Sequence, residues 1–234
     1  MTGMLASVAN LAEARLVAAA GVDIIDLKDP ARGVLGALAL PTVADLVAAL
    51  GGRHRLSATL GDLAMDPARV IPAARAMAAT GVAYVKIGFF PGGDWPGVIA
   101  GLAPLAAEGA RLVAVLFGDR APELGWIPPL AAAGFVGAML DTADKGAGSL
   151  PQVCPGEFLS AFVAAVRRQG LLSGLAGSLR SEDLDPLLAL DPDYLGFRGA
   201  LCGGNRTGAI QPEAVRALVA RIKGEGQAPA RVAR

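Results

Sequence analysis

Histidine and cysteine, which most often carry metal-dependent or nucleophilic chemistry, are nearly missing from this chain of 234 residues. The single histidine, His54, follows two glycines and an arginine, and we interpret it as a solvated loop residue at the start of a strand. One histidine argues against Ser-His-Asp catalysis and multi-histidine metal sites. The two cysteines, Cys154 and Cys202, cannot build a disulfide framework or a thiolate zinc site, so we expect no metal and a cytoplasmic location.

Net charge is missing as well, since 21 basic residues balance 21 acidic ones. That balance excludes a protein held to nucleic acid or to a membrane surface by bulk electrostatics. A transmembrane helix needs roughly 18 uninterrupted apolar residues, and glycine, proline or a charged residue breaks every apolar run before that length. The N-terminal stretch lacks a basic segment followed by an apolar block, so we expect no signal peptide, no membrane and no nucleic acid among the partners.

Apolar residues make up 53% of the chain, above the ~45–50% of an ordinary domain, which is typical of strands covered on both faces. Strand-length apolar runs alternate with stretches of helical periodicity, the pattern of a parallel α/β fold. We predict eight strands, at Met4–Val8, Asp23–Lys28, Arg55–Leu60, Ala83–Gly88, Arg111–Phe117, Gly137–Asp141, Leu171–Leu175 and Tyr194–Arg198. Helical stretches include Asn10–Ala20, Pro67–Thr80, Glu157–Gln169 and Pro212–Lys223.

The βα unit repeats, because the phrases AAAGVD, AATGVAY and AAAGFVGA each end a helix at glycine and enter a strand. Eight such units predict a single-domain α/β fold, a (β/α)8 TIM barrel, over residues 1–223, with a flexible C-terminal tail at residues 224–234. An open doubly wound sheet is the alternative, weakened by the lack of a GxGxxG motif after the first strand. Asn10 and Ser181 are predicted helix N-caps, and Gly21, Gly81, Gly134 and Gly170 are predicted helix ends.

Lysine is scarce, because arginine supplies 17 of the 21 basic residues, and three of the four lysines fall at predicted strand ends. Lys28 closes the second strand, Lys86 lies near the end of the fourth, and Lys145 comes four residues after Asp141, which ends the sixth. Reactive groups of a barrel gather at that end, so chance explains the placement poorly. The fourth lysine, Lys223, lies in the last predicted helix.

Asp26 and Lys28 are two apart on one strand and share a face, which we assign to the lumen because Ile25 and Leu27 then pack outward. Ser57 and Thr59 give the third strand a polar inner face in the same way. A neighbouring ammonium and partial burial lower the pKa of a lysine toward ~7–8, where its neutral amine attacks carbonyls. The pattern therefore favours imine-forming, aldolase-type chemistry.

The simpler alternative is that these lysines form ordinary ion pairs, Lys28 with Asp26 or Asp29 and Lys145 with Asp144. Two glycine-rich loops follow the seventh and eighth strands, where barrels often hold phosphate. Gly177, Ser178, Arg198 and Gly199 are the candidate phosphate-binding residues, because backbone N–H groups and a guanidinium suit an anion. The alternative is that the glycines only turn the chain.

Three further features have more than one interpretation. Cys202 is predicted to be a small packing residue, because no histidine is near enough to activate it. Asp62 either orients a lysine or caps the following helix. The pair Phe89 and Phe90 is expected to cover the mouth of the barrel or an interface rather than to bind a cofactor.

Six motifs in order carry a resemblance to a known family: DIIDLKDPARGVLGA (23–37), SATLGD (57–62), YVKIGF (84–89), MLDTADKGAGSL (139–150), LAGSL (175–179) and GFRGALCGGNRTGAI (196–210). From about residue 4 to 222 the sequence resembles the (5-formylfuran-3-yl)methyl phosphate synthase family, also called 4-(hydroxymethyl)-2-furancarboxaldehyde-phosphate synthase. The resemblance implies a barrel lyase that joins two glyceraldehyde 3-phosphates with loss of phosphate and water, making a precursor of methanofuran-type cofactors of one-carbon metabolism. It also implies that Lys28 forms the Schiff base, Lys86 accepts a proton, and Asp141 with Lys145 forms a further catalytic pair.

On this interpretation the substrate is a triose phosphate, Asp26 supports the lysines, and no metal or organic cofactor is required because the imine is the electron sink. We also expect a homo-oligomer. Two rival functions stay open: another class I (Schiff-base) sugar-phosphate aldolase, and a non-catalytic phosphate-binding barrel.

Overall fold

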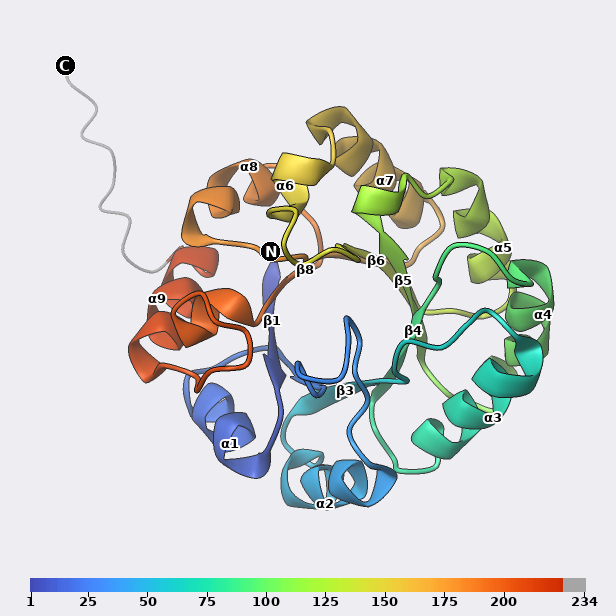
Figure 1. Cartoon of the computed structure of the whole chain (residues 1–234), viewed down its shortest axis with the longest axis horizontal. Coiled ribbons are helices and arrows are strands. Elements are labelled where there is room, and N and C mark those ends of the chain that lie inside the picture. The colour runs from blue at the N-terminus through green and yellow to red at the C-terminus, as the bar shows by residue number, and fades with distance from the viewer. Residues whose placement is uncertain (225–234) are drawn as a thin grey trace.

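Eight parallel strands close into a barrel in the computed structural model, which describes residues 1–224 (Figure 1). The strands are β1 (Gly3–Val8), β2 (Ile24–Leu27), β3 (Arg55–Thr59), β4 (Tyr84–Gly88), β5 (Leu112–Phe117), β6 (Gly137–Asp141), β7 (Leu172–Leu175) and β8 (Tyr194–Phe197). Each strand pairs with the next along the chain, and β1 pairs with β8 through Gly3 and Tyr194. The predicted single-domain (β/α)8 barrel is therefore confirmed.

Helices surround the barrel as an outer ring. They are α1 (Leu11–Ala19), α2 (Leu40–Leu50), α3 (Pro67–Ala78), α4 (Trp95–Ala107), α5 (Ile127–Ala132), α6 (Leu150–Val153), α7 (Gly156–Arg168), α8 (Leu184–Leu188) and α9 (Pro212–Ile222). In the described part of the chain, no helix combines the length and the apolar character needed to cross a membrane. The division into a barrel at 1–223 and a tail at 224–234 stays a prediction, since residues 225–234 lie outside the described residues.

The predicted helix boundaries hold at every position named except one. The Asn10 side chain accepts a hydrogen bond from the Glu13 N–H at 2.9 Å, as an N-cap does. Four helix ends take the left-handed backbone that glycine adopts freely, at Gly21, Gly81, Gly134 and Gly170. The N-cap prediction for Ser181 was wrong, because Ser181 opens a short 3-10 turn and the helix begins only at Leu184.

Apolar side chains form two separate cores, one between the strands and the helices and the other inside the barrel. Ile25 and Leu27 belong to the outer core, whereas Asp26 points into the lumen, which confirms the predicted alternation along β2. The inner core contains Leu5, Ile24, Leu35, Tyr84, Val113, Val115, Phe117, Met139, Ala176 and Tyr194. These side chains fill the interior of the barrel around the polar groups.

One member of the inner core, Leu35, comes from a loop rather than from a strand. The segment between Lys28 and Ala39 folds back into the ring of strands before α2 begins (Figure 1), and Leu35 is fully buried there. Gly36 permits this course, since a Cβ atom at that position would lie 2.2 Å from the Asp29 carbonyl oxygen. The segment, which we name the β2 loop (residues 28–39), covers part of the lumen.

The pair Phe89 and Phe90 divides between the two cores. Phe89 packs edge-on against Trp95 at 5.1 Å in the outer core, so its predicted place over the mouth or an interface was wrong. Phe90 packs on Phe117 at 4.6 Å on the lumen side. Cys202 is buried in the outer core, and burial raises the pKa of its thiol, which confirms the packing prediction.

Candidate active site

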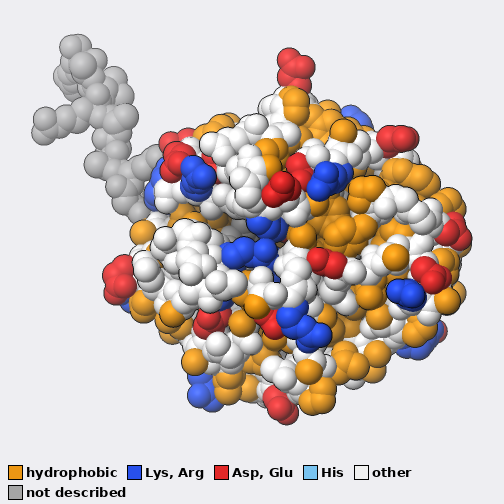
Figure 2. Space-filling view, in the orientation of Figure 1, with side chains coloured by type: hydrophobic (Ala, Val, Ile, Leu, Met, Phe, Trp, Pro, Cys, Tyr) orange, Lys and Arg blue, Asp and Glu red, His pale blue; other side chains and the backbone are white. Residues whose placement is uncertain are grey.

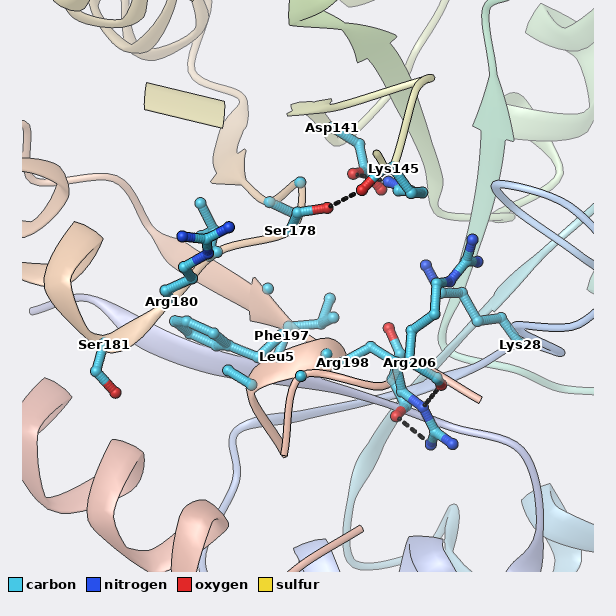
Figure 3. A pocket seen from close by; sticks show the side chains of 18 of the residues that line it. Leu5, Lys28, Asp141, Lys145, Ser178, Arg180, Ser181, Phe197, Arg198 and Arg206 are labelled. Carbon is cyan, nitrogen blue, oxygen red and sulfur yellow. Dashed lines mark hydrogen bonds and ion pairs between the residues drawn. The ribbon is translucent and has the colours of Figure 1, made fainter. Parts of the chain in front are cut away.

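The sequence-predicted site residues meet around one cavity of about 570 Å³ at the mouth of the barrel (Figure 3). Lysine and arginine side chains gather at this hollow in the space-filling view (Figure 2). The lining includes Lys28, Lys86, Asp141, Lys145, Gly177, Ser178, Arg198 and Gly199. Asp26 is the one predicted site residue that is not in the lining, because it lies fully buried beneath Lys86.

Asp26 is the centre of a buried polar network that joins the first four strands. Its carboxylate accepts hydrogen bonds from Ser7 (2.9 Å) and Ser57 (2.6 Å) and forms an ion pair with Lys86 at 3.0 Å. Burial alone would raise the pKa of Asp26, but the charges of Lys86 and Lys28 and the bond from Ser57 outweigh it and lower that pKa. Asp26 therefore stays ionised and holds the Lys86 ammonium in place.

Lys28 follows β2 directly and is 7% exposed. Burial, together with the charges of Lys145 and Lys86, lowers its pKa to about 8, although Asp141 and Asp26 act in the opposite sense. Within residues 1–224 no carboxylate lies within 4.0 Å of its ammonium, so the ion pairs proposed as the simpler alternative are not formed. Its Nζ is 3.4 Å from the Val34 carbonyl oxygen of the β2 loop. A lysine with this pKa has an appreciable neutral fraction near pH 7.

Asp141, at the end of β6, forms an ion pair with Lys145 at 2.5 Å. The suggested partner Asp144 was wrong, since the Asp144 carboxylate instead accepts the Gly146 N–H at 2.8 Å within the same turn. Burial opposes ionisation of Asp141, but the charges of Lys145 and Lys28 and a hydrogen bond from the Thr142 N–H lower its pKa to about 2. Asp141 therefore stays ionised beside Lys28.

Two aspartates outside the predicted site hold the loops that carry the lysines. Asp62 accepts the N–H groups of Val34 (2.8 Å) and Leu35 (2.7 Å) in the β2 loop. Asp119 likewise accepts the N–H groups of Ala143 (2.7 Å) and Asp144 (2.8 Å), the two residues that immediately precede Lys145. We call these contacts the loop clamps.

The loop clamps answer one open question and reveal one omission. Asp62 does not cap the next helix, because Asp66 does so by accepting the Ala68 N–H at 2.9 Å. Asp62 instead affects Lys28 through the β2 loop, whose N–H groups it accepts. Asp119 was missed by sequence reasoning. A signal existed, since Asp62 and Asp119 each follow a glycine just after an odd-numbered strand.

The backbone at Gly177 and Ser178 takes a left-handed conformation at two successive residues, with φ of 113° and 48°. Gly177 is required because a Cβ atom there would lie 2.7 Å from Thr142 Cγ2. The positive φ of Ser178 is strained for a residue with a Cβ atom, and strain of this kind is found mainly at functional sites. Its hydroxyl donates to the Lys145 carbonyl oxygen at 3.4 Å, so this loop lies on the Asp141–Lys145 side of the mouth (Figure 3).

Arg198 lines the cavity, but its guanidinium is already engaged. It forms a two-pronged ion pair with Glu13 (2.6 and 3.2 Å) and donates to the carbonyl oxygens of Ser7, Arg206 and Gly208. These contacts use all five N–H donors of an arginine. The geometry indicates that Arg198 braces the loop after β8, and its predicted contact with phosphate stays a prediction. Sequence reasoning missed Glu13, which is 185 residues away along the chain.

The sequence model of the 4-HFC-P synthase family matches residues 4–219. A protein of Methanosarcina barkeri named (5-formylfuran-3-yl)methyl phosphate synthase is 33% identical over 232 residues, covering 94% of this chain and 99% of that one. A Methylorubrum extorquens protein that carries the same name provisionally is 47% identical over 201 residues, covering 85% and 82%. Phosphoribosyl anthranilate isomerase from Thermus thermophilus has a TM-score of 0.67 at 18% identity, covering 96% and 99%, which shows a shared fold.

Proposed function

The chain belongs to the 4-HFC-P synthase family, and we propose on that basis that it is a (5-formylfuran-3-yl)methyl phosphate synthase. The reaction joins two molecules of glyceraldehyde 3-phosphate into one phosphorylated furan aldehyde and releases one phosphate and two molecules of water. It would make the furan precursor of a methanofuran-type cofactor. One observation carries the proposal: a buried lysine with a pKa of about 8 shares a cavity with two further lysines.

The first step is attack of the neutral Lys28 amine on the carbonyl carbon of one triose phosphate, with loss of water to give an imine. The lowered pKa supplies the neutral amine. Once protonated, the imine withdraws electrons from the adjacent carbon and makes its proton acidic. No metal ion or organic cofactor enters this step, and their absence from the reaction stays a prediction.

The Lys86–Asp26 pair would then receive that proton. Lys86 lines the cavity, while Asp26 beneath it is held by two serine hydroxyls and cannot reach the substrate. In the resting protein Lys86 is paired with the Asp26 carboxylate, so it accepts the substrate proton only as a neutral amine, after it has released its own proton to solvent through the cavity that it lines. Its charge at rest also favours a neutral Lys28.

The remaining steps need a group that gives and takes protons at oxygen, and the Asp141–Lys145 pair is suited to them. Lys145 can protonate the aldehyde oxygen of the second triose during carbon–carbon bond formation and the departing hydroxyl during dehydration. Gly177, Ser178 and Gly199 would offer backbone N–H groups to a phosphate on this side of the mouth.

The decisive experiment is incubation of the purified protein with glyceraldehyde 3-phosphate, followed by ultraviolet absorbance and mass spectrometry of the product. A phosphorylated furan aldehyde and an equal amount of free phosphate are expected. With borohydride present, the substrate should become fixed to Lys28, and Lys28→Arg should give neither product nor adduct, because arginine has no neutral amine at this pH. An acyclic hexose bisphosphate product would show a different class I aldolase, and binding without turnover would show a non-catalytic barrel.

A further inference from the structure

Arg206, in the loop between β8 and α9, is a cation of the mouth that the proposed chemistry has not used. Three arginines line the cavity. Arg198 is paired with Glu13, and Arg180 lies 3.7 Å from Glu182. For Arg206, no carboxylate of residues 1–224 lies within 4.0 Å of the guanidinium.

The side chain of Arg206 reaches across the mouth to the β2 loop. Its Nη2 donates to the Gly33 carbonyl oxygen at 2.8 Å, and the next carbonyl along the chain, that of Val34, faces Lys28 Nζ at 3.4 Å. The Arg206 guanidinium and the Lys28 amine therefore contact successive peptide groups of the β2 loop. Among the described residues, Nη2 is the only nitrogen of this guanidinium with a protein acceptor, and Arg206 lines the cavity, so its other N–H donors are available to a ligand.

The backbone that carries Arg206 is held firmly while its side chain is not. Arg198 Nε donates to the Arg206 carbonyl oxygen at 2.8 Å, and Arg198 itself is anchored by Glu13. On the other side, Asp62 holds the N–H groups of Val34 and Leu35, which fixes the loop that Arg206 touches. A single neutral carbonyl is a weaker partner for a guanidinium than a phosphate dianion is.

The reaction brings two phosphate groups into one cavity, and the structure offers two places for them. The loop at Gly177 and Ser178 lies beside Lys145, whereas Arg206 lies beside Lys28 on the β2 side. We propose that Arg206 binds the phosphate of the triose that forms the imine with Lys28, exchanging the Gly33 carbonyl for phosphate oxygens. This inference rests on the proposed function for the identity of the substrate, and it makes Arg206 a determinant of specificity for phosphorylated aldehydes.

The test compares imine formation by glyceraldehyde 3-phosphate and by glyceraldehyde, which has the same carbonyl and no phosphate. Borohydride trapping at Lys28 is measured against substrate concentration in the wild type, Arg206→Gln, Arg206→Lys and the control Arg180→Gln. Arg206→Gln should raise the half-saturating concentration of the phosphorylated substrate about ten- to a hundredfold, the range for a lost hydrogen bond to a charged group. The value for glyceraldehyde should not change, and Arg206→Lys should fall between, because it keeps the charge without the two-pronged fork.

A second readout does not depend on Lys28 chemistry. Glycerol 3-phosphate lacks a carbonyl, and calorimetry should show that Arg206→Gln weakens or removes one of its binding events while Arg180→Gln does not. An isotherm equal to that of the wild type, or an equal loss of affinity for glyceraldehyde, overturns the assignment. If the wild type makes the furan but the Arg206→Gln isotherm is unchanged, the proposed function is supported and the Arg206 assignment is rejected. Loss of phosphate binding in a protein that makes no furan would support Arg206 and reject the proposed function.

Discussion

The reactivity of Lys28 is set by the charges around a single amine. Burial is the largest cause of its lowered pKa, and the ammonium groups of Lys145 and Lys86 add to the effect. Both neighbours form ion pairs with carboxylates, at 2.5 and 3.0 Å, which hold their ammonium groups in position. The two ion pairs thus keep positive charge near Lys28, which has no carboxylate partner within the described residues, and this charge lowers its pKa.

Replacing either neighbour should move the titration of Lys28 in a known direction. In Lys145→Met or Lys86→Met, a positive charge disappears and an aspartate is left uncompensated, and both changes raise the pKa of Lys28. The inflection of borohydride trapping, expected near pH 8 in the wild type, should therefore move to higher pH. Lys86→Met should still form the imine but lose furan synthesis by about 10²–10⁴-fold, the worth of a general base.

Lys223→Met is the matched control, because that lysine lies at the end of α9 and donates to the Gly21 carbonyl at 2.9 Å, away from the cavity. Its trapping profile should equal that of the wild type. An unmoved profile in Lys86→Met, with normal furan synthesis, would make Lys86 a structural residue.

At the scale of elements, the Arg198–Glu13 pair joins the loop after β8 to α1. Arg198→Ala removes a side chain that is 7% exposed and leaves the Glu13 carboxylate and three carbonyl groups without their donor. Breaking a pair of this kind costs about 3 kcal/mol, to be measured by urea denaturation. The KM for triose phosphate should also rise, because the loop that carries Arg206 loses its brace. Full stability with a raised KM would instead favour direct contact of Arg198 with phosphate.

The loop clamps belong to the same scale. In Asp119→Ala, the N–H groups of Ala143 and Asp144 lose their acceptor, and the segment leading to Lys145 gains freedom. A displacement of about 1 Å at a catalytic group lowers the rate about a hundredfold, so kcat should fall by that order while imine trapping at Lys28 persists. Hydrogen exchange at residues 143 and 144 checks the cause.

Asp94→Ala, which removes the N-cap of α4, is a control for a general loss of rigidity. Equal kcat losses in Asp94→Ala and Asp119→Ala would contradict a specific role for the Asp119 clamp.

At the scale of the whole molecule, the reactive lysine lowers the stability of the fold. The pKa of Lys28 is about 8 in the folded protein against 10.5 for the free side chain. Below pH 8 the folded protein must hold a buried charge at a cost of about 3 kcal/mol, since one pKa unit is worth about 1.4 kcal/mol. Between pH 8 and 10.5 the unfolded chain binds more protons, so stability from this group rises with pH, and the cost is gone above 10.5.

Lys28→Met should therefore be inactive and yet more stable than the wild type at pH 7, by about 3 kcal/mol. The difference should shrink as the pH rises from 8 to 10.5. Denaturant unfolding at pH 7, 9 and 10.5 measures it, with Lys223→Met as the surface control. If the variant is less stable than the wild type at pH 7, the attraction between Lys28 and Asp141 stabilises the fold by more than the burial of the Lys28 charge destabilises it.

The sequence alone determined the barrel, the outer and inner faces of its strands, and the placement of Lys28, Lys86, Asp141 and Lys145 at one mouth. These features depend on periodicities of two and 3.6 residues and on the rule that strand ends of a barrel converge, all of which are local in the chain. The family resemblance depended on the same short motifs.

Only the tertiary structure decided which charges pair. Arg198 meets Glu13 across 185 residues, Lys86 meets Asp26 across 60, and Asp119 reaches 24 residues forward to Ala143. Such partners depend on the register of the strands and on the course of the loops, which no local pattern encodes. For this reason the sequence indicated an arginine near a phosphate but not that Arg198 is fully engaged. Among the described residues, Arg206 is the arginine of the cavity that has no carboxylate partner.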